Sequence, residues 1–152
     1  MDKNIKITFG NNYIINLIKK KHPSRKIYIF KSINNVNQNY QIVDFSNKRS
    51  IFKNKLEYRI IYSNSINDNK EMVNYLYFNL DEENTKILKA NMINIKYKNV
   101  NSIYMLKEDF GKKRDILMTC WKSYKDFYHW FHNNPVVKIS DLSMTYKKDR
   151  CL

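Results

Sequence analysis

Apolar residues in the first 66 positions cluster in short blocks separated by polar residues. Blocks rich in Ile, Val, Tyr and Phe are typical of strands, and those predicted here cover residues 5–9, 26–32, 40–46 and 57–63. Between the first two blocks, apolar residues recur four positions apart, which predicts a helix that ends near Lys21, before Pro23. Residues 50–54 predict a short helical turn. The predicted order is strand, helix, strand, strand, short helix, strand.

The same order is predicted again after the polar residues 64–70. Strands are predicted at residues 73–80, 102–107, 114–121 and 142–147. A helix is predicted over residues 81–95, because three acidic residues stand at its start and Leu88, Met92 and Ile95 share one face. Two successive units of this kind predict an internal repeat and an α+β protein made of two halves, residues 1–66 and 70–152.

The helix after residue 121 has the clearest local signal. Ser123 is a predicted N-cap with Asp126 in the capping-box position three residues later. Tyr124, Phe127 and Phe131 then follow one helix face, and Pro135 ends the helix.

Composition limits the class of protein. The chain has 152 residues, 43% of them hydrophobic, with only 2 Gly and 2 Pro, so it predicts one compact folded body without a phosphate-cradling glycine loop. Cys120 and Cys151 form neither a metal-binding pattern nor a disulfide framework. No apolar stretch approaches a membrane span and the first residues do not resemble a leader. We therefore expect a cytoplasmic protein with reduced thiols, possessing no metal site.

The charge favours anionic partners. The formal net charge is +14 and the pI is about 9.7, with Lys and Arg spread over several groups instead of one tail. A basic surface of this kind suits an anionic membrane surface or a peptide or protein partner. Nucleic acid is a further alternative, for which Tyr28, Tyr40 and Tyr104 are expected on strands where bases can stack.

Residues 114–133 carry a family resemblance. An apolar strand leads into Trp121-Lys-Ser and then into Asp126-Phe-x-x-Trp130, a segment that resembles the antibiotic biosynthesis monooxygenase superfamily, including its haem-degrading oxygenases. Residues 7–10, 16–19 and 25–30 resemble the TRAP family of bacterial signal-transduction proteins. The resemblance implies two fused ferredoxin-like halves that form a pseudo-dimeric α/β barrel within a monomer.

The resemblance also implies site residues. The haem-degrading relatives use an Asn on a strand, the Trp of the Phe-x-x-Trp helix and a later His that ligates the iron. Trp130 matches the Trp, and Asn74 matches the Asn, with Asn79 as the alternative register. Ser140 stands where the His is expected, and the chain is predicted to pass from Pro135 directly into its last strand.

The missing His changes the expected function, because haem iron needs an axial donor such as imidazole, thiolate or phenolate. The resemblance then implies a protein that needs no cofactor and acts by binding in signalling, stress response or protection against an antimicrobial or membrane insult. The alternative is a small monooxygenase that degrades haem or oxidises an aromatic substrate. In that case His132 is the candidate haem ligand, Asn74 and Trp130 are catalytic, and the pocket is lined by Trp121, Phe127 and Phe131.

Overall fold

The computed structural model describes residues 3–33, 39–65, 70–94, 99–109, 111 and 113–149. The N-terminal half comprises β1 (Asn4–Gly10), α1 (Asn12–Lys21), β2 (Ile27–Ser32), β3 (Tyr40–Asp44) and β4 (Leu56–Ser65). The C-terminal half comprises β5 (Met72–Phe78), α2 (Glu82–Asn94), β6 (Val100–Glu108), β7 (Asp115–Trp121), α3 (Tyr124–Asn133), α4 (Pro135–Lys138) and β8 (Leu142–Lys148).

The eight strands form one closed antiparallel barrel in the order β1-β3-β2-β8-β5-β7-β6-β4. Within it, β4-β1-β3-β2 and β8-β5-β7-β6 repeat the ferredoxin-like strand order. The two halves meet at the pairs β2–β8 and β4–β6, so each half closes the sheet of the other. The predicted α+β fold of two fused ferredoxin-like halves is confirmed.

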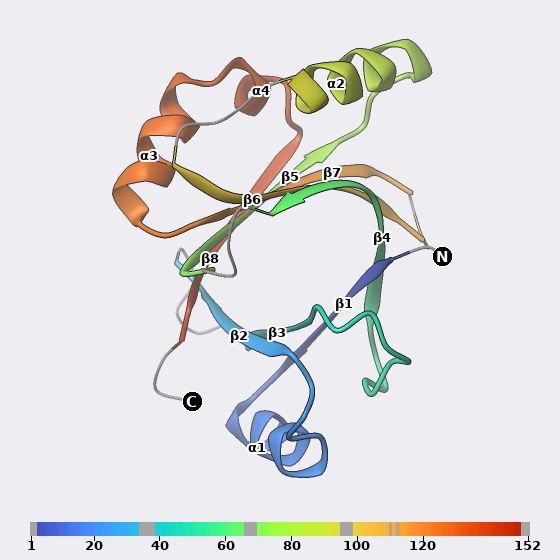
Figure 1. Cartoon of the computed structure of the whole chain (residues 1–152), viewed down its shortest axis with the longest axis vertical. Helices are drawn as coiled ribbons and strands as arrows, with labels where there is room; N and C mark the ends of the chain where they lie inside the picture. Colours follow the sequence, from blue (N-terminus) through green and yellow to red (C-terminus); the bar gives the residue numbers. More distant parts are fainter. Residues whose placement is uncertain are drawn as a thin grey trace.

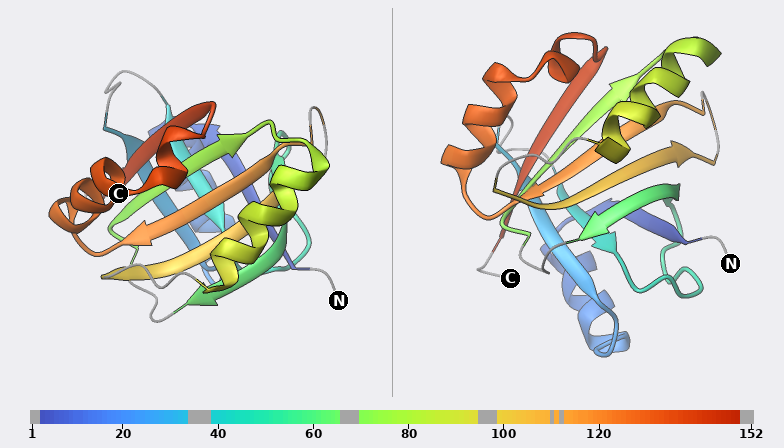
Figure 2. Two further views of the ribbon diagram at one scale, coloured as in Figure 1. Left: turned by 90° about the horizontal axis from the view of Figure 1, so that it is seen from above. Right: turned by 45° about the horizontal axis from the view of Figure 1, so that its top comes forward.

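Helices cover the barrel on opposite sides (Figure 1). α1 packs on the outer face of the N-terminal sheet, whereas α2, α3 and α4 lie across the outer face of the C-terminal sheet (Figure 2). No helix in the described ranges is both long and apolar enough to cross a bilayer.

Side-chain alternation along the strands divides the core into three layers. The barrel interior contains Ile5, Ile7, Tyr75, Tyr77, Met118 and Cys120 among others. A second layer lies between the C-terminal sheet and its helices and includes Leu76, Leu117, Trp121, Phe127 and Trp130. The third layer, beneath α1, is built on Ile15, Ile29, Ile42 and Phe52.

Local sequence explains where the helices begin. Asn11 caps α1 by accepting a hydrogen bond from the Ile14 amide at 3.1 Å. α1 follows β1 so closely that a Cβ at Gly10 would lie 2.9 Å from Ile14 Cβ, which only glycine avoids. The predicted N-cap of α3 is confirmed, since the Asp126 amide donates to Ser123 Oγ at 3.2 Å, and the Asp126 carboxylate accepts from the Ser123 hydroxyl at 2.9 Å.

Two sequence predictions are wrong. Residues 50–54 form no helical turn, because the carbonyls of Lys48 and Arg49 accept hydrogen bonds from the side chains of Lys6 and Arg25 instead of from later backbone amides. The chain also does not pass straight from Pro135 into the last strand. The four-residue helix α4 intervenes, started by Asn134, whose side chain accepts from the Val136 amide at 2.9 Å.

Candidate functional site

Asn74 lies on the outer face of β5, in the layer between the sheet and α3. The strand register places it between Thr119 on β7 and Thr145 on β8. Its Nδ2 donates to Thr145 Oγ1 at 2.9 Å and to Ser143 Oγ at 3.0 Å. Its Oδ1 is buried and accepts no hydrogen bond from the described residues. Hydrogen bonds to β8 therefore hold the amide within the sheet.

Asn79, the candidate in the alternative register, lies outside this layer. It follows the end of β5, is exposed, and its backbone amide donates to Asp141 Oδ2 at 2.7 Å. Of the two Asn candidates, only Asn74 lies in the same layer as Trp130.

Trp130 packs against the sheet together with the expected pocket residues. Its ring centroid lies 5.3 Å from that of Trp121 and 6.4 Å from that of Phe127. Trp121 is fully buried and donates from Nε1 to Thr119 Oγ1 at 2.9 Å. The ring centroid of Phe131 lies 5.3 Å from that of Phe127, and the two rings are tilted by 45°. The sequence thus brings the four aromatic residues together, and their rings fill the layer between α3 and the sheet.

The histidines lie outside this layer. His132 is exposed, and its ring centroid lies 4.1 Å from that of Tyr128, which is itself 52% exposed. His129 is exposed beside Asn133. His22 ends α1 in the other half of the molecule. An α-helix turns 100° per residue, so position 132 faces almost opposite to position 130.

The residues in this layer do not fit haem. Ser140, at the expected ligand position, donates to the Val137 carbonyl at the end of α4, and Val136 fills the layer beneath that helix. Cys120 lies on the other side of the sheet, in the barrel interior, where burial raises the pKa of its thiol to about 12. Among the described residues, no cluster of His, Cys, Asp and Glu is arranged to hold a metal ion.

Thr119, Ser143 and Thr145 are site neighbours that sequence reasoning missed. They are small polar residues within apolar strands, and this feature of the sequence could have marked them as neighbours of a buried polar group. Their relation to Asn74 depends on the pairing of three strands, and a single sequence does not specify that register.

Tyrosines occupy much of the barrel interior. Burial raises the pKa of Tyr75 well above its ordinary range and that of Tyr146 to about 12. The prediction that Tyr104 is available for base stacking is wrong, and Tyr28 is partly buried. Tyr104 is 8% exposed, and both rings pack against the interior, because they occupy inward positions of their strands. The third candidate, Tyr40, is only half-buried but packs against the layer beneath α1.

Positive charge is concentrated in the N-terminal half. Residues 1–66 contain 13 Lys and Arg but only 3 Asp and Glu, whereas residues 70–152 contain 15 and 10. Lys19, Lys20 and Lys21 are exposed in the last turn of α1. At the other end of this helix, Tyr13 is 68% and Ile14 39% exposed.

A groove runs beside these residues, between α1 and residues 46–55, which we call the basic loop. Its volume is about 340 Å³, and its walls are mainly apolar, with Phe9, Ile14, Leu17 and Phe52 flanked by Lys21 and Lys53. Phe9 is 45% exposed at its edge. Cations therefore border an accessible apolar surface.

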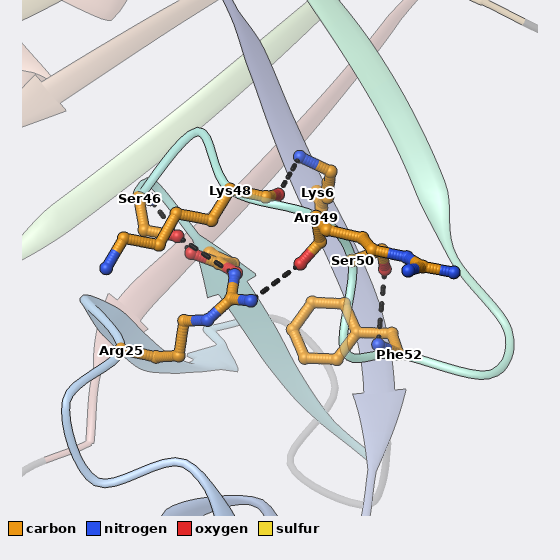
Figure 3. A network of polar contacts seen from close by, with 8 residues as sticks. Lys6, Arg25, Ser46, Lys48, Arg49, Ser50 and Phe52 are labelled. Atoms are coloured by element: carbon orange, nitrogen blue, oxygen red, sulfur yellow. Dashed lines mark hydrogen bonds and ion pairs between the residues drawn. The ribbon is translucent and has the colours of Figure 1, made fainter.

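The basic loop is fixed by side chains from neighbouring elements (Figure 3). Arg25 donates to the Arg49 carbonyl at 2.7 Å and forms an ion pair with Asp44 at 3.2 Å. Lys6 donates from Nζ to the Lys48 carbonyl at 2.7 Å. These contacts hold the backbone while the side chains of Lys48 and Arg49 remain exposed.

A pocket of about 440 Å³ lies on the C-terminal half, between the start of α2, the ends of β5 and β6, and the start of β7. Lys86, Lys107 and Lys113 line it together with Asp115. Thr85 Oγ1 donates to Asp115 Oδ2 at 3.3 Å. This pocket is separate from the Trp130 layer, since it lies at the start of β7 and Trp121 stands at its end.

No protein-family model and no curated protein matches the sequence. Solved structures do match over nearly the whole chain. A ferredoxin-fold protein of Listeria monocytogenes related to antibiotic biosynthesis monooxygenases is 14% identical with a TM-score of 0.75, covering 99% of this chain and 96% of its own. A haem-degrading enzyme of the same species is 15% identical with a TM-score of 0.70, covering 97% and 100%.

A major regulator of staphylococcal pathogenesis is similar to the same extent. It is 10% identical with a TM-score of 0.74, and the alignment covers 97% of this chain and 100% of the regulator. One fold thus serves both an enzyme and a regulator among the similar structures. The chain has the fused ferredoxin-like barrel fold of proteins related to the antibiotic biosynthesis monooxygenases.

Proposed function

We propose that this protein acts by binding, without haem oxygenase activity, and that its N-terminal half docks on an anionic membrane surface on the cytoplasmic side. A role in signalling, stress response or protection against a membrane insult would follow from such docking. The observation that carries the proposal is that apolar residues and lysines are both exposed on and next to α1. Tyr13 and Ile14 are exposed in the first turn of α1 and Phe9 just before it, and Lys19, Lys20 and Lys21 are exposed in the last turn.

Membrane interfaces attract this combination. Apolar side chains enter the boundary between headgroups and acyl chains, while each Lys near an anionic surface contributes about 1 kcal/mol of attraction. None of the three lysines forms an ion pair with a described residue, so their charge is available. The packing of Trp130 on Trp121 supports the other part of the proposal, because it leaves the aromatic layer filled.

Vesicle sedimentation tests the docking. Wild-type protein should bind vesicles that contain phosphatidylglycerol and should not bind pure phosphatidylcholine. Replacing Lys19, Lys20 and Lys21 with Gln should weaken binding about 100-fold at low salt. The matched control replaces three exposed lysines: Lys122 in the segment before α3, Lys125 on α3 and Lys138 on α4. It removes the same charge from the opposite side of the barrel (Figure 1). Equal losses in both variants would refute a docking face on the N-terminal half.

A haemin titration tests the absence of haem chemistry. We expect no saturating shift of the Soret band, and the same weak adsorption in wild type and in the His132→Ala variant. A stoichiometric shift that His132→Ala abolishes would show that the exposed imidazole reaches iron, and it would revive the monooxygenase alternative.

A further inference from the structure

Lys6 is a buried cation on the outer face of β1. It is only 6% exposed, although its neighbours Ile5 and Ile7 point into the barrel and leave it on the side of the basic loop. The strand register places it between two carboxylates, Asp44 on β3 and Glu57 on β4. Either residue would be the expected counter-ion.

Both carboxylates are occupied by other groups. Asp44 accepts from Arg25 Nη1 at 3.2 Å and from the Ser46 amide at 2.8 Å. Glu57 accepts from Asn4 Nδ2 at 2.9 Å and pairs with Lys55 Nζ at 3.5 Å. Each negative charge is therefore already matched by a positive one.

Lys6 itself lacks a counter-ion within the described part of the chain. Its ammonium group has three donors, of which one is used, toward the Lys48 carbonyl at 2.7 Å. A buried charge without an opposite charge is costly, and folded proteins rarely retain one that is not paired in some functional state. The remaining donors are available for an anion.

Lys6 lines a pocket of about 340 Å³ between β1, β4 and the basic loop. Lys48 and Arg49 line the same pocket, and neither forms an ion pair with a described residue. Glu57, which lines the same pocket, is paired with Lys55, so Lys6, Lys48 and Arg49 are the cations of this lining that form no ion pair with a described residue. In Figure 3 the side chains of Lys48 and Arg49 extend in opposite directions from the loop backbone. Because Lys6 and Arg25 fix the loop backbone (Figure 3), only the exposed side chains of Lys48 and Arg49 have to turn toward a ligand.

We infer that this pocket binds the phosphate group of a phosphomonoester, with Lys6 as its anchoring residue. A phosphate dianion offers several acceptor oxygens and two negative charges, which suits one buried ammonium, one further Lys and a guanidinium fork better than a single carboxylate does. The phosphate belongs either to a lipid headgroup or to a soluble molecule. The headgroup source rests on the proposed membrane docking, because residues 47–50 of the basic loop line the pocket and residues 51–54 line the apolar groove.

Phosphorus NMR and calorimetric titrations with inorganic phosphate and glycerol 3-phosphate test the pocket. Full-length wild-type protein should bind one equivalent, and Lys6→Gln should weaken binding at least tenfold while its amide still bonds to the loop. Arg49→Gln, at an exposed position that leaves the fold intact, should weaken it several-fold. Lys122→Gln is the charge-matched control and should bind like wild type. No phosphate binding by wild type, or equal affinity in all three variants, would overturn the inference.

Vesicles distinguish the source of the phosphate. If the source is a headgroup, Lys6→Gln should weaken binding to phosphatidic acid, a phosphomonoester, and leave binding to phosphatidylglycerol unchanged at equal surface charge. If the source is soluble, Lys6→Gln should bind both vesicles like wild type and lose only soluble phosphate. If the wild-type protein binds soluble phosphate but binds neither kind of vesicle, the membrane docking is refuted and the pocket is supported.

Discussion

Trp121 and Trp130 show how single side chains decide what the layer between α3 and the sheet can do. In a site that admits a planar ligand, an aromatic ring lines an open space, whereas here two indole rings lie 5.3 Å apart and one of them is fully buried. Close-packed rings contribute to stability through apolar burial and ring contact. Their observed arrangement is therefore that of a core.

Truncation of Trp130 tests this reading. Trp130→Ala should lower the free energy of unfolding by about 3–5 kcal/mol, because it leaves a cavity against Trp121. Tyr128→Ala is the matched control on the same helix, since Tyr128 is 52% exposed, and it should have little effect. Urea unfolding followed by circular dichroism measures both. Similar stabilities of the two variants would contradict a core role for Trp130.

Some residue positions could be predicted and others could not. The family resemblance implied that Trp121, Phe127 and Phe131 lie around one pocket together with Trp130, and in the structure these residues belong to one layer. Whether the rings line a space or fill it depends on distances of a few ångströms that no spacing contains. Asn74 illustrates the same limit, since its hydrogen bonds go to a strand 69 to 71 residues later in the chain.

At the scale of elements, the basic loop is the part that departs most from its sequence pattern. Strands and helices were predicted within a few residues because hydrophobic periodicity specifies them. The loop takes its shape from cations of β1 and of the segment before β2, which are distant in sequence. Local propensity therefore predicted a helical turn that tertiary contacts override.

Removing Arg25 should loosen this loop. Arg25→Gln leaves Asp44, whose side chain is 1% exposed, without its ion pair, and we expect a loss of about 3 kcal/mol in the free energy of unfolding. Trypsin should then cleave after Lys48 or Arg49 faster than in wild type. Arg114→Gln is the control, because the pair with Glu108 is more exposed, at 29% and 12%, and should matter less. Unchanged cleavage in Arg25→Gln would show that other contacts hold the loop.

At the scale of the whole molecule, the buried tyrosines and Cys120 should make the free energy of unfolding fall at alkaline pH. Burial raises the pKa of Cys120 from 9.0 to about 12 and that of Tyr146 from 10.0 to about 12. Groups whose pKa is higher in the folded state retain protons that the unfolded chain releases. Their stabilising contribution is thus complete below about pH 9 and is lost as pH rises toward 12.

The urea concentration at the midpoint of unfolding should stay constant up to about pH 9 and should fall at higher pH. The Tyr146→Phe variant removes one of the hydroxyls and should show a shallower decline. Tyrosinate absorbance provides a second readout, since the interior tyrosines should ionise only as the fold is lost. Ionisation near pH 10.0 with intact secondary structure would contradict their burial.

The two seams of the barrel, β2 with β8 and β4 with β6, have a consequence for how the protein can change. In a barrel assembled from two copies of one chain, each substitution alters both walls at once. Fusion uncouples them. One wall carries the basic loop while the other carries three packed helices, so the phosphate site proposed at the loop would have no duplicate in the other half.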